Sequence, residues 1–121
     1  MNMEDCIFCK IIAGTIPSHK LFEDEKVFVF LDAFPINSGH ALLVPKLHYD
    51  RFDTMPQDIA IELARCLHDL APRIAASLGA EGFNLGLNNG SVAGQAVNHV
   101  HWHIIPRYSS DGLKPWPNKN V

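Results

Sequence analysis

The chain has 121 residues and a formal net charge of −3 at pH 7, which fits a single domain and excludes a two-domain enzyme. Apolar residues make up 47% of the chain and charged residues 19%, a composition that supplies one hydrophobic core and argues against global disorder. Binding along a nucleic acid requires clustered Lys and Arg, so the slightly acidic balance argues against a nucleic-acid partner.

The cellular location can also be predicted from the sequence. Met1 to Asp5 include acidic residues where a secretory signal would have basic residues before an apolar stretch. The longest aliphatic run, Ala41 to Val44, is too short to cross a bilayer. We therefore expect a cytoplasmic protein without a membrane partner, in which Cys6, Cys9 and Cys66 are thiols or metal ligands rather than a disulfide framework.

The first part of the chain predicts a short helix and three strands. Asp5 to Ala13 has helical apolar spacing, and Gly14 follows in the usual helix-stop position. His19 to Phe22 and Lys26 to Leu31 flank an acidic turn and are rich in β-branched and aromatic residues, which predicts a hairpin. A third strand is expected from His40 to Val44 after a turn-forming stretch.

One long helix and two further strands follow. Apolar residues recur every three or four positions from Ile59 to Leu78, and Gly79 ends the pattern. Phe83 to Leu87 alternates apolar and polar positions as a strand with one apolar face does, and His99 to Ile105 forms the fifth strand. Hairpins with one long helix predict an α+β domain on a five-stranded antiparallel sheet.

Three histidines alternate along the last predicted strand. Because a strand has a period of two, His99, His101 and His103 share one face, with neighbouring Cα atoms roughly 6.6 Å apart. The apolar residues between them point toward the core. Imidazoles with this spacing suit a metal clamp, a polar sheet face or catalysis on one small substrate group. A catalytic role predicts that the His101 ring is exposed beside a pocket.

A polar, glycine-rich loop precedes these histidines. Residues Gly86 to Gln95 include three glycines, two asparagines, a serine and a glutamine. Such a loop can bring backbone N–H groups close to a phosphate, and the same composition also suits a plain turn. Because the loop adjoins nucleophilic imidazoles, the combination favours phosphate or phosphoramidate chemistry.

The Cys6-x-x-Cys9 pair fits a redox motif, half of a zinc site or two small core residues. A redox motif opens a helix directly after a strand, and no strand is predicted before Cys6. A tetrahedral zinc site needs two further ligands. Cys66 lies on the apolar stripe of the long helix and is assigned to the core. The histidines outside any such pattern are assigned structural or solvent-exposed roles: His19, His40 and His68.

Five motifs in order make the chain resemble the Hint-like branch of the histidine triad superfamily. The histidine segment matches the His-x-His-x-His-x-x signature, with Gly94-Gln95 upstream as in that branch. The other matching segments are Cys6 to Ile12, Phe30 to Asp32, Gly39 to His48 and His103 to Arg107. The resemblance covers nearly the whole chain. It implies the HIT-like α+β fold, with one long and one short helix, over residues 5–108 and a C-terminal tail over 109–121.

The resemblance implies a nucleotide hydrolase or transferase that acts on the α-phosphate of purine nucleoside phosphoramidates or related AMP conjugates. His101 would form a covalent nucleotidyl-histidine, and His103 would contact the phosphate or the leaving group. A leaving amine departs protonated, and a histidine can supply that proton near neutral pH. The alternatives are a dinucleoside polyphosphate hydrolase, a non-catalytic nucleotide-binding scaffold, and a small zinc-binding protein that uses the histidine face for metal.

The resemblance also assigns the substrate contacts. Asp32 matches the position that binds the ribose hydroxyls. The expected surroundings of the base are Phe8, Phe30 and Ile36. The groups expected to hold the phosphate are Asn88, Gln95 and the backbone of Gly94. Ala96 stands where many Hint-like proteins have a serine close to the scissile phosphate, so this chain lacks the hydroxyl contact expected there and its leaving-group preference is open.

By the same resemblance, the chain would bind a structural zinc and no organic cofactor. The zinc ligands would be Cys6, Cys9, His48 and His99. In that case His99 would brace the strand that carries His101. The resemblance further implies a homodimer joined across the long helix and a strand. Trp116, in the Pro-rich tail, is expected either to reach the partner's pocket or to belong to a frayed end.

Overall fold

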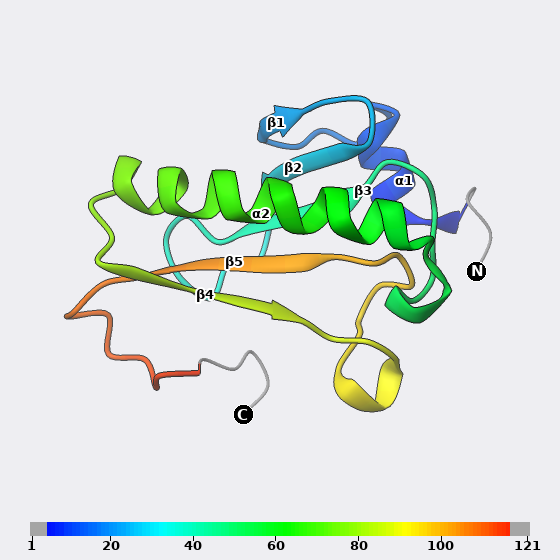
Figure 1. Cartoon of the computed structure of the whole chain (residues 1–121). Helices are drawn as coiled ribbons and strands as arrows, with labels where there is room; N and C mark the ends of the chain where they lie inside the picture. The colour runs from blue at the N-terminus through cyan, green and yellow to red at the C-terminus, as the bar shows by residue number, and fades with distance from the viewer. Residues whose placement is uncertain (1–4, 117–121) are drawn as a thin grey trace.

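The computed structural model describes residues 5–116 and consists of one sheet with helices on both faces (Figure 1). Met1–Glu4, which carry most of the acidic N-terminal stretch, and the end of the expected tail, 117–121, lie outside the described residues. The elements in chain order are α1 (Ile7–Ile12), β1 (Lys20–Glu23), β2 (Val27–Leu31), β3 (Ala41–Pro45), the 3-10 helix η2 (Phe52–Thr54), α2 (Gln57–Ser77), β4 (Gly82–Leu87), the 3-10 helix η3 (Ser91–Ala93) and β5 (Trp102–Arg107).

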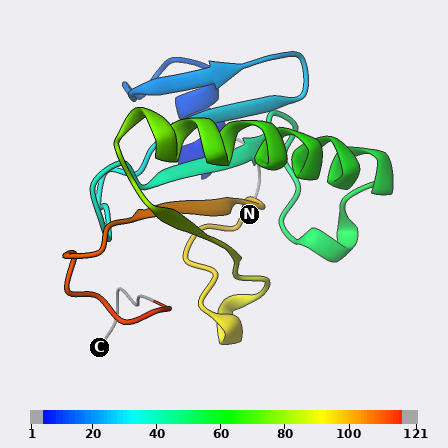
Figure 2. The same ribbon diagram turned by 60° about the vertical axis from the view of Figure 1, so that its left-hand side comes forward.

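The five strands form one antiparallel sheet in the order β1-β2-β3-β5-β4. The predicted α+β class, the five antiparallel strands and the pair of one short and one long helix are therefore confirmed. Figure 2 shows the sheet from a second side, with α1 behind it and α2 in front. Among the described residues, no helix is both long enough and apolar enough to cross a bilayer.

Short polar groups and glycines close the turns where the sequence predicts them. The Asp24 carboxylate accepts hydrogen bonds from the backbone N–H groups of Lys26 and Val27, both at 2.8 Å, which closes the β1–β2 hairpin. Gly79 has φ +69° just after α2, a conformation that L side chains rarely adopt. The long helix therefore ends where its apolar pattern ends.

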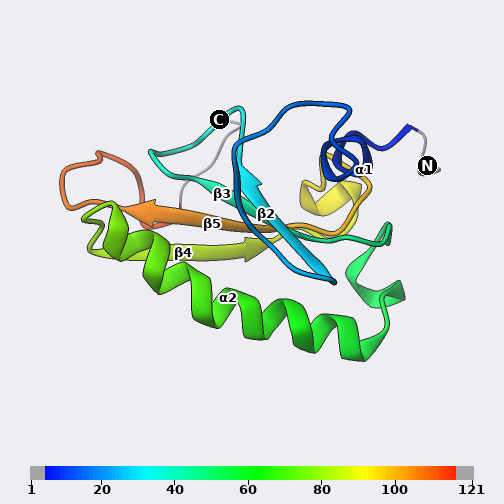
Figure 3. The ribbon, with the colours of Figure 1, turned by 90° about the horizontal axis from the view of Figure 1, so that it is seen from above.

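Apolar side chains are buried on both faces of the sheet. Successive side chains of a strand point to opposite faces, so β2 places Val27 and Val29 against α2, and Phe28 and Phe30 against α1. The view from above in Figure 3 shows the two helices on opposite sides of the sheet. Burial on both faces explains why the β2 and β3 segments are almost continuously apolar rather than alternating.

The last strand begins later than the sequence analysis predicts. We expected it from His99, but β5 begins at Trp102. The residues before it bond elsewhere: His99 N–H donates to the carbonyl of Val97 at 2.9 Å, and Val100 N–H donates to the carbonyl of Tyr49 at 2.8 Å. Because Val100 is bonded to the loop after β3, the residues before Trp102 do not form regular strand pairing with β3 or β4.

The register of β5 sets the position of the site. His103 pairs with Leu42 of β3 on one side and with Gly86 of β4 on the other. Leu42 belongs to the core under α1. His103 therefore lies on the α1 face, on an interior strand of the sheet.

Candidate active site

The three histidines of the triad lie together on the α1 face, as predicted from their alternation. The ring of Phe8 contacts those of His99 and His101 edge-on, with centroid distances of 5.8 and 5.1 Å, and the His101 ring lies 5.1 Å from that of His103. Val100 and Ile104 pack in the α2 core, as expected. The prediction that His101 is exposed is wrong: it is 5% exposed, because Phe8 of α1 packs over it.

Backbone carbonyls set the proton positions of two triad histidines. The Nε2 atom of His99 is 2.8 Å from the carbonyl of Pro45, and Nδ1 of His101 is 2.8 Å from the carbonyl of His99. A carbonyl oxygen only accepts, so each of these nitrogens carries the proton. In the neutral rings the lone pair therefore lies on Nδ1 of His99 and on Nε2 of His101.

A fourth histidine, His40, belongs to the same group. Its ring is buried, with Nε2 2.9 Å from Nδ1 of His103 and 3.6 Å from the Asp32 carboxylate. The prediction of a structural or solvent-exposed role for His40, which placed it outside any cluster, missed this position. The pairing of β3 with β5 brings it there, and neighbours across a sheet cannot be read from one strand's periodicity.

Residues expected around a nucleoside lie next to this group. Phe30 is buried and its ring packs edge-on against Phe8, with centroids 5.5 Å apart. Asp32 accepts a hydrogen bond from the backbone N–H of Phe34 at 3.0 Å, and the backbone N–H of Ile36 donates to His40 at 3.0 Å. The aromatic side chains and the carboxylate are thus at the histidine end of the sheet.

The four expected zinc ligands form a second cluster on the other side of His99. Their donor atoms all lie within 4.8 Å of one another: Cys6 Sγ, Cys9 Sγ, His48 Nδ1 and His99 Nδ1. Sγ of Cys6 is 3.4 Å from His99 Nδ1, and Sγ of Cys9 is 3.4 Å from His48 Nδ1. Two sulfurs and two imidazole nitrogens are a donor set that suits tetrahedral zinc.

The ring orientations also fit a metal. In both histidines the nitrogen that faces the sulfurs is the one opposite a fixed hydrogen bond. His99 donates through Nε2 to the carbonyl of Pro45, and His48 Nε2 is 2.6 Å from the Asp50 carboxylate. Such outer hydrogen bonds orient imidazole ligands and keep the other nitrogen available for a cation.

Burial keeps two groups of the cluster, the Cys9 thiol and the His99 imidazole, uncharged at neutral pH. It raises the pKa of the Cys9 thiol to about 11, with hydrogen bonding to Cys6 as a further cause. Burial lowers the pKa of His99 to about 4, opposed by the bond to Pro45. At neutral pH the cluster therefore holds a thiol and a neutral imidazole, and a bound cation would have to displace the thiol proton.

The glycine-rich loop between β4 and β5 is fastened to the segment that follows β3. Gln95 is buried; its amide nitrogen donates to the carbonyls of Asp50 and Val97 at 2.6 and 3.0 Å, and its oxygen accepts from Gly90 N–H at 2.7 Å. The amide group of Gln95 thus holds the loop in place. Asn88 lies across the loop, with its amide nitrogen 3.4 Å from the carbonyl of Gly94.

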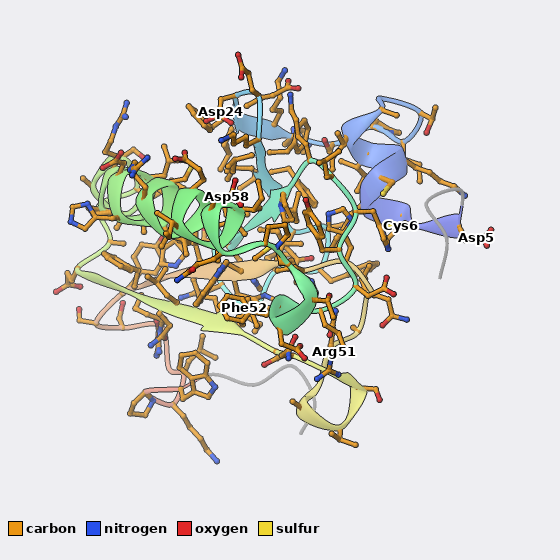
Figure 4. The ribbon with its side chains drawn as sticks, turned by 45° about the vertical axis from the view of Figure 1, so that its right-hand side comes forward. Asp5, Cys6, Asp24, Arg51, Phe52 and Asp58 are labelled. Atoms are coloured by element: carbon orange, nitrogen blue, oxygen red, sulfur yellow. The ribbon has the colours of Figure 1, made fainter. Side chains whose placement is uncertain are left out.

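Arg51 lies directly against the same loop. Figure 4 shows Arg51 and Phe52 beside the turn that carries η3. Gly90 has φ +93°, and a Cβ there would lie 2.7 Å from an Arg51 guanidinium nitrogen. Asn89 adds a second link, because its oxygen accepts from the backbone N–H of Phe52 at 2.7 Å and its nitrogen donates to Asp53 at 3.0 Å.

The described part of the tail folds back onto its own sheet. Arg107 binds the Asp111 carboxylate through two nitrogens, at 2.8 and 3.2 Å, and donates to the carbonyl of Pro115 at 2.9 Å. The Trp116 ring then lies against Gly86, where a Cβ would be 2.6 Å from the ring. Since Gly86 pairs with His103, this indole covers the sheet beside the triad within the same chain.

Asp111→Asn should loosen this tail. Bonding to Arg107 lowers the pKa of Asp111 and keeps it ionised, so its contribution is present at neutral pH and is lost only as the pH falls through that lowered value. The amide cannot accept both guanidinium bonds, and Trp116 should become more accessible. Acrylamide quenching of tryptophan fluorescence measures this. Asp69→Asn, a change on the exposed side of α2, is the control, and unchanged quenching in Asp111→Asn would contradict the tethering role.

An α+β sheet that gathers a histidine triad, a glycine-rich loop and a Cys₂His₂ cluster on one face defines a protein of the histidine triad class. The family model of the HIT domain matches residues 13–110. The chain belongs to the HIT domain family.

Similar proteins agree with this assignment. An uncharacterized HIT-like protein of Methanocaldococcus jannaschii is 54% identical over 109 residues, covering 88% of this chain and 82% of that protein. An adenosine 5'-monophosphoramidase of Saccharomyces cerevisiae is 40% identical over 114 residues, covering 93% and 70%. The crystal structure of a zinc-bound histidine triad family protein from Mycobacterium smegmatis superposes with a TM-score of 0.86 at 32% identity, covering 98% and 86%.

Proposed function

We propose that this chain is a nucleotide hydrolase or transferase acting on the α-phosphate of purine nucleoside phosphoramidates or related AMP conjugates. The observation that carries the proposal is the His101 ring, whose Nδ1 proton is held by the carbonyl of His99 and whose Nε2 lone pair can attack phosphorus. The relative named an adenosine 5'-monophosphoramidase supports the substrate class.

The first step forms a covalent intermediate. Nε2 of His101 bonds to phosphorus while the bond between phosphorus and the leaving nitrogen breaks, and His103, acting as an imidazolium, supplies a proton to that nitrogen and becomes neutral. The His101 ring becomes cationic, and its Nδ1–H remains on the carbonyl of His99, which stabilises the positive charge.

Water completes the cycle. It attacks phosphorus as the bond to His101 breaks, and its proton passes to His103. AMP leaves, and both rings return to their starting protonation. A nucleophile that forms an intermediate divides one difficult displacement into two easier ones.

The placement of the surrounding residues supports the substrate contacts that the resemblance implies. Asp32 would bind the ribose hydroxyls, with Phe8, Phe30 and Ile36 around the base. Asn88 and the Gly94 backbone would hold the phosphate, and Gln95 would act by holding the loop. Ala96 offers no hydroxyl to the leaving group, so we expect its departure to depend on His103.

We also propose that Cys6, Cys9, His48 and His99 bind a structural zinc. The convergence of their four donor atoms supports this site. Zinc would stabilise the fold by joining α1 to the segment that carries the triad. It takes no part in the chemical steps.

A cytoplasmic homodimer fits the remaining observations. Thiol ligands persist in a reducing compartment. β4 is an edge strand of the sheet, and Phe83 on it is 37% exposed. An edge strand with an exposed aromatic residue is suited to pairing with a second copy, and sedimentation equilibrium would detect a monomer if the proposal is wrong.

Comparing two substrates tests the function. We expect faster turnover of an AMP amidate than of diadenosine tetraphosphate, because the site has a proton donor for an amine. Intact mass spectrometry during turnover should detect an adenylyl adduct, and digestion should locate it on His101. Faster cleavage of diadenosine tetraphosphate would favour the polyphosphate hydrolase. Nucleotide binding without any adduct or turnover would favour the non-catalytic scaffold.

A further inference from the structure

The side chain of Asn89 joins the glycine-rich loop to the 3-10 helix η2. Its oxygen accepts a hydrogen bond from the backbone N–H of Phe52 at 2.7 Å, and its nitrogen donates to the Asp53 carboxylate at 3.0 Å. Phe52 is the first residue of η2, where a backbone N–H finds no partner within the helix. Both ends of the Asn89 amide are thus bonded to one distant element, and we call this pair of bonds the Asn89 link.

The Asp53 carboxylate also holds Arg51. Nε of Arg51 donates to the carboxylate oxygen that Asn89 binds, at 3.1 Å. A guanidinium nitrogen of the same arginine lies against Gly90, 2.7 Å from where a Cβ would be. Hydrogen bonding from Asn89 is the largest cause that lowers the pKa of Asp53. The carboxylate is therefore ionised at neutral pH, which strengthens both bonds.

The two neighbours of Asn89 in the chain make the bonds that close the loop. The amide nitrogen of Asn88, which precedes it, is 3.4 Å from the carbonyl of Gly94. The backbone N–H of Gly90, which follows it, donates to the Gln95 side chain at 2.7 Å. Peptide groups are planar, so a rotation of the Asn89 backbone would displace both neighbours. Fixing Asn89 therefore fixes both of these bonds.

We propose that Asn89 is a positioning residue that holds the glycine-rich loop ready for phosphate by linking it to Phe52 and Asp53. Asn89 itself touches no substrate and acts through Asn88 and the Gly94 backbone. This inference rests on the proposed function, in which those two groups hold the phosphate. A loop that is fixed before the ligand arrives loses less conformational freedom on binding, so the phosphate is bound more tightly.

Exchanging the two side chains isolates the bond between Asn89 and Asp53. In Asn89→Asp two carboxylates face each other at hydrogen-bond distance, so they repel and the Asn89 link opens. In Asp53→Asn the amide oxygen can still accept from Asn89, so the link is kept. In the double variant Asn89→Asp/Asp53→Asn donor and acceptor are reversed, and the carboxylate at position 89 still accepts from Phe52. Asn89→Leu removes both bonds without adding a charge.

NMR titrations with AMP and with adenosine test the effect on phosphate binding. Adenosine has the same base and ribose but no phosphate. We expect Asn89→Asp and Asn89→Leu to raise the Kd of AMP about tenfold, the effect of about one lost hydrogen bond, and to leave the Kd of adenosine unchanged. Asp53→Asn and the double variant should bind AMP nearly as the wild type does. Asp69→Asn, at an aspartate about as exposed as Asp53, is the control.

Three results of these titrations would overturn the proposal. Equal losses for AMP and adenosine would indicate a general loss of structure rather than a displaced phosphate loop. Wild-type affinity in Asn89→Leu would show that the effect of Asn89→Asp comes from its added charge alone. Failure of the double variant to recover AMP affinity would show that the bond to Asp53 is not the one that matters.

Steady-state kinetics on an AMP amidate should separate binding from chemistry. In Asn89→Leu we expect KM to rise about tenfold and kcat to fall less than about threefold, because the loop holds the phosphate in the ground state and in the transition state alike. A loss confined to kcat would assign Asn89 to the chemical steps and contradict the positioning role.

Amide hydrogen exchange gives a readout that requires neither substrate nor turnover. The Gly90 N–H, bonded to Gln95, should exchange about tenfold faster in Asn89→Leu and in Asn89→Asp, and near the wild-type rate in the double variant. Unchanged exchange in the single variants would contradict the proposal. This exchange pattern in a protein that binds no AMP would support the positioning of the loop by Asn89 while rejecting the proposed function.

Discussion

His101→Asn should reduce kcat for an AMP amidate on the order of 10⁴-fold or more, because it removes the nucleophile. The fold should survive. The Asn nitrogen occupies the position of Nδ1 and can still donate to the carbonyl of His99, so the bond that orients this side chain is retained. Steady-state kinetics measure the loss, and far-UV circular dichroism checks the fold.

Two further variants make this result specific. His101→Ala should be equally inactive, and it should also lose stability, by about 1–3 kcal/mol, because the buried ring against Phe8 is removed. His68→Asn replaces an exposed histidine of α2 and should keep wild-type activity and the adenylyl adduct. An active His101→Asn enzyme would reject the nucleotidyl-histidine mechanism.

The proposed zinc site predicts that the metal contributes strongly to the stability of the wild-type protein. A ligand present at 100 times its Kd stabilises the folded state by about 2.7 kcal/mol, which for a domain of this size corresponds to about 10 °C in Tm. We therefore expect added zinc to raise Tm by about this amount, and a chelator to reverse it. Differential scanning calorimetry with elemental analysis measures both the shift and the metal content.

Variants locate the metal. Cys9→Ser should lose most of the zinc-dependent shift, because one of the four donors is replaced by a weaker one. Cys66→Ser changes a thiol of α2 outside the cluster and should keep it. His101→Asn should also keep zinc. Loss of zinc from that variant would instead indicate that the triad itself holds the metal.

Local sequence patterns predicted the helices and strands, but they predicted the first and last residues of these elements less accurately. Helical spacing from Ile59 to Leu78 and alternation from Phe83 to Leu87 predicted α2 and β4, because one face of each is buried and the pattern records that burial. The start of β5 was misplaced, since bonding of Val100 to Tyr49 is a long-range contact. A strand pattern shows which face a residue takes and not where its ladder begins.

The candidate site could likewise be predicted from local patterns only in part, because several of its contacts join distant segments. Alternation placed the triad on one face, whereas the metal set was available only through resemblance, because Cys6 and His99 are 93 residues apart. His40 was missed because its role depends on the neighbouring strand. The bracing bonds of Gln95 and the contact of Trp116 with Gly86 also join distant segments. No local spacing rule contains such contacts.

Main-chain atoms orient three imidazoles of the site, those of His99, His101 and His40. The carbonyls of Pro45 and His99 and the amide of Ile36 depend on the course of the backbone, not on the identity of the side chains there. Substitutions in the surrounding loops can therefore alter substrate preference without disturbing the proton arrangement. Substitution of Ala96, or of Trp116 where its indole covers Gly86, would therefore change which substrates are accepted. The proposed reaction at phosphorus would stay the same.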